Sequence, residues 1–194
     1  MIAILFACKN SIYKTLPGVD VFDIERDATT FSGLYPVVCH PPCRSWGRLA
    51  HRANPRPGEK ELALFAVDIV RRNGGILEHP AYSKLWAVKG LPIPGAGYDE
   101  YKGFSISVDQ SWWGHRAKKA SWFYICGLDK DQLPALPMNF DAIQRTISSR
   151  IKKKDNHPGW KPELPKSERE KTPSDLAKWL VESAQKCKVK KHPV

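Results

Sequence analysis

Two adjacent prolines that follow a short apolar run constrain this chain more than any other feature. The run is Val37-Val38, and Pro41-Pro42 follows it after two residues. β-Branched residues favour a buried strand, and proline cannot donate to a sheet ladder, so the strand must end here. In open α/β sheets, ligands bind just beyond the carboxyl ends of strands. Cys43 comes next, and it is either a nucleophile at such an edge or a small buried residue beside a turn.

The rest of the chain alternates between strand and helix patterns. Strands are expected over residues 2–7, 20–25, 76–77, 104–113 and 122–125, and helices over residues 59–72 and 172–187. In the second helix we expect Thr172 as the N-cap and Pro173 as the first helical residue. Its inner face is expected to consist of Leu176, Trp179, Leu180 and Ser183. Residues 87–103 are rich in Gly and Pro and are expected to form a loop. The alternation predicts an α/β fold, with a Rossmann-like mixed sheet and flanking helices.

The chain divides into four expected parts. They are a core over residues 1–127, a proline-rich basic excursion over 128–171, a helix over 172–187 that packs on the core, and a tail over 188–194. Residues 104–125 are expected to form a hairpin whose turn is strongly basic.

The net charge of +11 suggests a polyanionic partner. Residues 145–194 hold 14 Lys and Arg against six Asp and Glu, and they include Lys152, Lys153 and Lys154. Such a segment is typical of nucleic-acid binding, although a solvated basic tail without a partner has the same composition. We therefore expect a nucleic acid as the partner, which the family resemblance given below specifies as DNA.

Membrane insertion and export are not expected. No run of about 18 apolar residues is present, and residues 1–7 lack the basic lead of a signal peptide. Five cysteines, an odd number, favour reduced thiols in the cytoplasm over a disulfide framework. Zinc bound by Cys39, His40 and Cys43 with His51 or His79 is an alternative, but no second pair stands at zinc-finger spacing; we expect no metal.

Two other strand ends carry acids. Glu78 is followed by His79 and Pro80, which repeats the layout of strand, polar residue and proline seen before Cys43. Glu25 stands at the carboxyl end of the second strand, where an acid commonly holds the ribose of a nucleotide, although an acid at such a position is more often a solvated turn carboxylate. A thiol near a carboxylic acid suggests covalent catalysis on an electron-poor ring. Arg44 and His40 are expected to lower the thiol pKa.

These residues resemble, in order and spacing, motifs of the DNA cytosine-5 methyltransferase family. The matching segments are Pro41-Pro42-Cys43 with Ser45, Leu77-Glu78-His79-Pro80, and Trp113-Gly114 followed by Arg116, Lys118, Lys119 and residues 122–127. Leu5-Phe6-Ala7 and residues 21–27 are similar to the family's cofactor-binding strands. The resemblance covers about residues 4–127 and implies a compact, phage-type member that acts in a bacterial host cell and uses S-adenosylmethionine.

The resemblance also implies roles for individual residues. Cys43 would be the nucleophile that attacks a base flipped out of the duplex, Glu78 would engage the ring nitrogen, and Arg116 and Lys119 would be active-site cations. Phe6, Glu25 and Pro41 would bind the cofactor. The residues expected to contact nucleic acid are Arg44, Ser45, Trp46, Arg48, His115, Lys118, Lys152, Lys153 and Lys154. Trp46, Trp112 or Trp113 would stack on the base or fill the gap, although tryptophans of this kind are more often part of the core.

Several departures keep other functions open. The glycine loop of the family is replaced by Phe6-Ala7-Cys8-Lys9-Asn10, and the interval between Glu25 and Cys43 is too short for the usual strand and helix. One alternative is therefore a degenerate, methyltransferase-like protein that binds DNA or opposes restriction without methyl transfer. Another is an enzyme that keeps Cys43 and Glu78 but transfers a different group or acts on free nucleotides. Dimerisation, by which a protein this small would cover its site, is a further alternative.

Overall fold

The fold is a mixed α/β structure built on one six-stranded sheet. The computed structural model describes residues 1–139, 143–148 and 157–189. The strands are β1 (Ile2–Leu5), β2 (Val19–Val21), β3 (Val37–Cys39), β4 (Gly75–Pro80), β5 (Phe104–Asp109) and β6 (Ala120–Cys126), in the order β2-β1-β3-β4-β6-β5. β1 to β4 are parallel, and β6 is antiparallel to both β4 and β5. The expected Rossmann-like mixed sheet is compatible with this arrangement.

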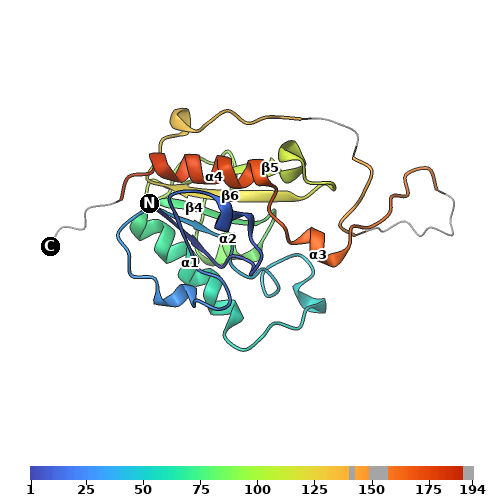
Figure 1. The fold of residues 1–194 in the computed structure, drawn as a ribbon, viewed down its shortest axis with the longest axis horizontal. Helices are drawn as coiled ribbons and strands as arrows, with labels where there is room; N and C mark the ends of the chain where they lie inside the picture. Colours follow the sequence, from blue (N-terminus) through green and yellow to red (C-terminus); the bar gives the residue numbers. More distant parts are fainter. Residues whose placement is uncertain (140–142, 149–156, 190–194) are drawn as a thin grey trace.

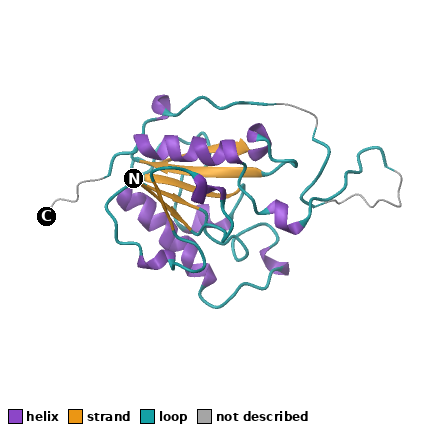
Figure 2. Cartoon of the chain, in the orientation of Figure 1, coloured by secondary structure: helices purple, strands orange, loops and turns teal. Residues whose placement is uncertain are grey.

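Helices cover both faces of the sheet. They are α1 (Glu59–Asn73), α2 (Lys84–Val88), α3 (Lys166–Arg169) and α4 (Ser174–Lys186). α1 packs on one face and α4 on the other, and long irregular segments connect the hairpin to α4 (Figures 1 and 2). The chain is therefore a three-layer structure.

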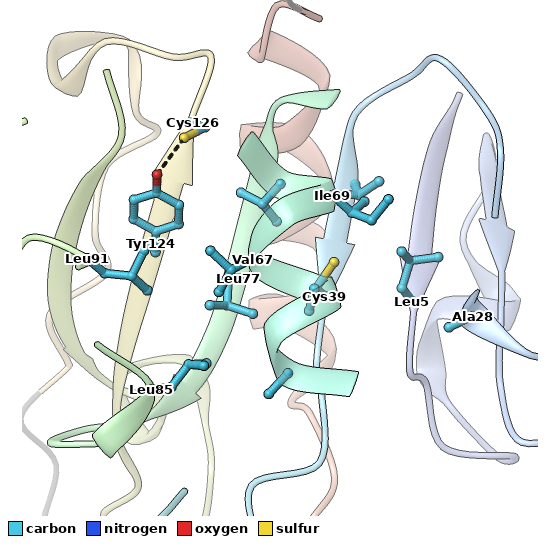
Figure 3. Packing of buried hydrophobic residues seen from close by; sticks show 14 of the residues in the cluster. Leu5, Ala28, Cys39, Val67, Ile69, Leu77, Leu85, Leu91, Tyr124 and Cys126 are labelled. Carbon is cyan, nitrogen blue, oxygen red and sulfur yellow. Dashed lines mark hydrogen bonds between the residues drawn. The ribbon is translucent and has the colours of Figure 1, made fainter. Parts of the chain in front are cut away.

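Alternation along the strands divides the core into two halves. Leu5, Cys39 and Leu77 face α1, where Val67 and Ile69 pack against them (Figure 3). Their sequence neighbours on the strands face α4, whose expected inner side, Leu176, Trp179, Leu180 and Ser183, is buried. The helical periodicity thus correctly predicted the buried side of α4, whereas on α1 the buried positions include Ala63, Val67 and Val70, and the expected Leu62 and Phe65 are only partly buried.

The ends of several elements differ from expectation. β1 and β2 end at Leu5 and Val21, earlier than predicted, and residues 110–113 form a 3₁₀ helix because the Asp109 carboxylate accepts from Ser111 N at 3.0 Å. α2 begins before the predicted loop and extends into it at Ala87 and Val88. α4 begins at Ser174, so Pro173 rather than Thr172 occupies the N-cap position.

The order of the parallel strands reverses between β1 and β3. β2 lies on one side of this point, and β4 lies on the other. Ligands of open α/β sheets bind at such a reversal, outside the carboxyl ends of the strands. Because β6 runs antiparallel, its amino end meets the carboxyl end of β4, and Ser121 stands opposite Pro80. This edge of the sheet is called the carboxyl edge below.

None of the helices in the described ranges is long and apolar enough to cross a membrane.

Candidate functional site

The carboxyl edge brings together Cys43, Glu78 and Lys119. Cys43 lies just beyond β3 in a tight turn, where its carbonyl accepts from Trp46 N at 3.0 Å and Gly47 N at 2.8 Å. Glu78 lies near the end of β4, and Lys119 directly precedes β6. Cys43 is exposed and Glu78 is buried. The two prolines therefore end the strand and present the thiol as the sequence predicts.

The Glu78 carboxylate accepts hydrogen bonds on both oxygens. Ser121 Oγ and Gln110 Nε2 donate to Oε1 at 2.6 and 2.9 Å, and His40 Nδ1 lies 3.2 Å from Oε2. Burial alone would raise the pKa of Glu78, but these donors, His40 foremost, and the charge of Lys119 hold the pKa well below its usual range. Glu78 is therefore ionised at neutral pH and acts as a hydrogen-bond acceptor.

His40 is held between Glu78 and Tyr13. An ionised carboxylate can only accept, so His40 Nδ1 carries a proton, and in the neutral ring Nε2 then accepts from the Tyr13 hydroxyl at 2.9 Å. Burial and the nearby Glu78 charge raise the pKa of Tyr13 well above its usual value, which keeps the phenol protonated. Tyr13 thus fixes the orientation of the His40 ring, and His40 in turn holds Glu78.

The Cys43 thiol is not activated in the way the sequence predicts. Burial of the thiol and the Glu78 charge raise the pKa of Cys43, and Lys119 opposes them. Arg44 does not lower the pKa because its Nε donates to the buried Glu59 carboxylate at 2.8 Å. The expectation that Arg44 and His40 activate the thiol is therefore wrong. Lys119 is the cation that favours the thiolate.

The predicted nucleic-acid contacts divide into exposed and buried groups. Arg48 and Lys118 are exposed, and Ser45 is partly exposed. Trp46 is 2% exposed, and its indole N–H donates to Lys60 O at 3.1 Å, so it cannot stack on a base. His115 is also buried, which contradicts the prediction that it contacts DNA.

Other predicted residues have different positions. Arg116 pairs with Glu168 of α3 at 2.7 Å, so it ties the hairpin turn to the C-terminal segment. Trp113 is buried in the core against Trp179, and Trp112 is partly buried. Lys152, Lys153 and Lys154 lie outside the described residues.

The predicted cofactor residues Phe6, Glu25 and Pro41 lie beyond the carboxyl ends of β1, β2 and β3, respectively. Phe6 is partly buried and adopts φ +64°, so a bulky residue makes the turn for which a glycine would be expected. Pro41 is buried. Glu25 is exposed and pairs with Lys9 at 2.6 Å, a surface contact worth at most about 1 kcal/mol.

His79 is a buried residue that the sequence pattern does not identify. It is fully buried beside Trp86, and neither ring nitrogen has a hydrogen-bond partner of good geometry. Burial lowers the pKa of His79 to about 4, although Glu78 and the Pro42 carbonyl raise it in part. The only sequence signal is the alternation of β4, which places His79 on the α1 side of the sheet and Glu78 on the α4 side.

The free energy of unfolding should decrease at acidic pH because of His79. The pKa is about 6.5 in the unfolded chain and about 4 in the folded protein, so the unfolded state binds more protons between these values. Stability should be intact above pH 6.5 and should fall by about 3 kcal/mol as the pH approaches 4. Urea unfolding of wild type and His79→Leu at pH 7 and pH 4.5 tests this, because the variant should lose most of that pH dependence. An equal decline in both proteins would contradict it.

The alternative zinc site has no support in the geometry. Cys39 is buried in the core, where burial raises its pKa strongly, and His79 faces the α1 side. Within residues 1–139, 143–148 and 157–189, no group of three or more His, Cys, Asp or Glu could hold a metal ion.

Comparison with known proteins identifies no relative of this chain. No protein-family model, no curated protein and no solved structure matches this chain.

Proposed function

We propose that the chain is a DNA-modifying enzyme that methylates cytosine through a covalent bond to Cys43. The observation that carries the proposal is that the Cys43 thiol, just beyond β3, and the buried, ionised Glu78 carboxylate, on the adjacent strand β4, lie at the same edge of the sheet, next to the strand-order reversal between β1 and β3. The carboxylate is kept ionised by three hydrogen-bond donors, and carboxylates with strongly shifted pKa values are concentrated at functional sites. The methyltransferase-like core is part of the same proposal.

The chemistry assigns a role to each group. The Cys43 thiolate adds to ring carbon 6 of a flipped cytosine, and the ring electrons move toward carbon 5, which then accepts the methyl group. A solvent water or hydroxide takes the proton from carbon 5, and the electron pair of that C–H bond re-forms the double bond between carbons 5 and 6 as the thiolate leaves. The resemblance assigns Glu78 to the ring nitrogen. Because the ionised carboxylate can only accept, it would bind that nitrogen in its protonated form and the adjacent exocyclic amino group, while Lys119 would favour the thiolate.

S-adenosylmethionine would supply the methyl group. Glu25 would accept from its ribose hydroxyls, while Phe6 and Pro41 would contact its apolar parts.

DNA is the proposed partner because exposed cations lie on the loop that follows the nucleophile. Arg48, Arg52 and Arg56 are exposed and take part in no ion pair within the described ranges. Cations that neutralise phosphates release counterions, and each one adds about 0.9 to the slope of log affinity against log salt. The double variant Arg48→Ala/Arg52→Ala should therefore bind duplex DNA more weakly, with a slope reduced by about 2.

Fluorescence anisotropy at 50–300 mM KCl measures this slope. Lys102→Ala/Lys130→Ala is the matched control, since both lysines flank β5 away from the carboxyl edge. An unchanged slope for the arginine variant would contradict the assignment.

Transfer of a labelled methyl group tests the proposed reaction directly. The protein is incubated with DNA and S-adenosylmethionine carrying a labelled methyl group, and the nucleosides are then separated. Label should appear on carbon 5 of cytosine. The absence of label under conditions in which the protein binds both DNA and S-adenosylmethionine would reject the proposal.

A DNA-binding protein without methyl transfer, including an anti-restriction protein, is the second candidate. The raised pKa of Cys43 favours it, because a thiol that is mostly protonated at neutral pH is a weak nucleophile. This candidate predicts tight, salt-dependent DNA binding with no binding of S-adenosylmethionine by calorimetry. Measured binding of S-adenosylmethionine would contradict it.

A further inference from the structure

Tyr82 is the exposed end of a buried aromatic stack. It follows β4 by two residues and is 68% exposed, and its ring centroid lies 4.9 Å from that of Trp122 at a tilt of 54°. Trp122 in turn packs edge-on against Trp86 at 5.5 Å, and the Trp86 N–H donates to Ser105 Oγ at 2.9 Å. Both tryptophans are buried. The Tyr82 ring is therefore supported from behind and open in front.

The backbone holds Tyr82 in this position at a cost. Its φ is +62°, a left-handed conformation that costs a residue with a side chain on the order of 1 kcal/mol. The next residues are fixed, since Ser83 Oγ caps α2 by accepting from Leu85 N at 3.2 Å, and Lys84 N donates to Trp46 O at 3.0 Å. A single exposed aromatic residue is common on protein surfaces. An exposed aromatic residue with a left-handed backbone, followed by residues that hydrogen bonds hold in place, is less common.

Tyr82 lies on the same edge of the sheet as Cys43. Trp46, whose carbonyl accepts from Lys84 N, belongs to the turn that the Cys43 carbonyl closes. Lys84 and Arg48 are exposed on this edge and form no ion pair within residues 1–139, 143–148 and 157–189. An open aromatic face with unpaired cations around it is the combination that binds single-stranded nucleic acid, in which bases stack and phosphates pair with cations.

We propose that Tyr82 is a stacking platform for an unpaired nucleobase of the DNA that reaches Cys43. The proposal rests on DNA as the partner, but it does not require methyl transfer. It also replaces Trp46, which the sequence suggested for this role and which is buried. The strand would pass over Tyr82 with its phosphates toward Lys84 and Arg48.

Binding to oligonucleotides with and without bases tests the platform. Fluorescence anisotropy compares wild type, Tyr82→Ala and Tyr82→Phe on a single-stranded oligonucleotide and on an abasic strand with the same number of phosphates. Tyr82→Ala should bind the base-containing strand about tenfold more weakly and the abasic strand equally well. Tyr82→Phe should bind both strands as wild type does, because the phenyl ring retains the stacking face.

Tyr98→Ala is the matched control. Tyr98 is also exposed, at 49%, and its ring packs on Phe104, at the start of β5 and thus at the opposite edge of the sheet. Its loss should change neither affinity. Circular dichroism of all variants reports folding, so a loss of affinity in an unfolded variant is recognised.

Each other outcome overturns the inference. If folded Tyr82→Ala binds both strands as wild type does, or loses equal affinity for both, Tyr82 does not stack on a base, while DNA remains the partner. If the wild type binds neither strand nor duplex DNA, the stacking role and the proposed partner both fail. Methyl transfer is measured separately, so its absence alone leaves the platform standing.

Discussion

Cys43→Ala should abolish methyl transfer to DNA while leaving DNA affinity unchanged. Removing the sulfur removes the atom that forms the covalent bond, and no other step can replace it, so the rate should fall by at least about a thousandfold. Because Cys43 is exposed in a turn held by backbone hydrogen bonds, the substitution should change stability by less than about 0.5 kcal/mol. Label incorporation and anisotropy on the same preparation measure both quantities.

Cys8→Ala is the matched control for this experiment. Cys8 is another exposed thiol at the end of the neighbouring strand, and burial together with Glu170 raises its pKa while Lys119 lowers it. Cys8→Ala should retain wild-type activity because Cys8 follows β1, two strands away from the Glu78 strand β4, and Glu78 acts on the pKa of Cys43 but not on that of Cys8. If Cys8→Ala loses activity and Cys43→Ala retains it, the nucleophile is Cys8 and not Cys43.

Gly75→Ala should prevent folding. Gly75 adopts φ +127°, and an added Cβ would lie 1.9 Å from the Val37 carbonyl oxygen, a backbone atom of the paired strand β3. Relief of this clash requires β3 and β4 to separate, which would disrupt the centre of the sheet and the carboxyl edge with it. We expect a loss above about 4 kcal/mol, comparable with the whole stability of many domains.

Gly18→Ala separates the clash from the backbone preference. Gly18 also has positive φ, at +72°, but an added Cβ there would meet no atom within 4 Å. Its loss should cost only about 1 kcal/mol. Urea unfolding followed by circular dichroism compares the two variants, and equal stability in both would show that the strands tolerate the extra carbon.

Local sequence patterns predicted the scaffold well. The apolar run Val37-Val38 followed by two prolines correctly predicted a buried strand and its end. Helical spacing correctly predicted α1 and the inner face of α4. These features depend on neighbours in the chain, and for that reason a single sequence reveals them.

Residues that act through distant contacts were not predictable in this way. Gln110 and Ser121 donate to Glu78 from 32 and 43 residues along the chain, and Tyr13 reaches His40 across 27 residues. Nothing in the local pattern of these residues indicates a buried carboxylate as their partner. Trp46 was misassigned for the related reason that its indole N–H is satisfied by Lys60, a contact that only the tertiary structure forms.

The antiparallel strand β6 determines when the hydrogen-bond network around Glu78 can assemble during synthesis of the chain. Cys43 and Glu78 emerge from the ribosome well before Ser121 and Lys119, which reach them only when β6 inserts between β4 and β5. Pairing between segments so distant in sequence is slow, because loop closure precedes any gain from the contact. A nascent chain therefore carries its thiol without the assembled carboxylate network, and a truncation before residue 120 should yield an inert product.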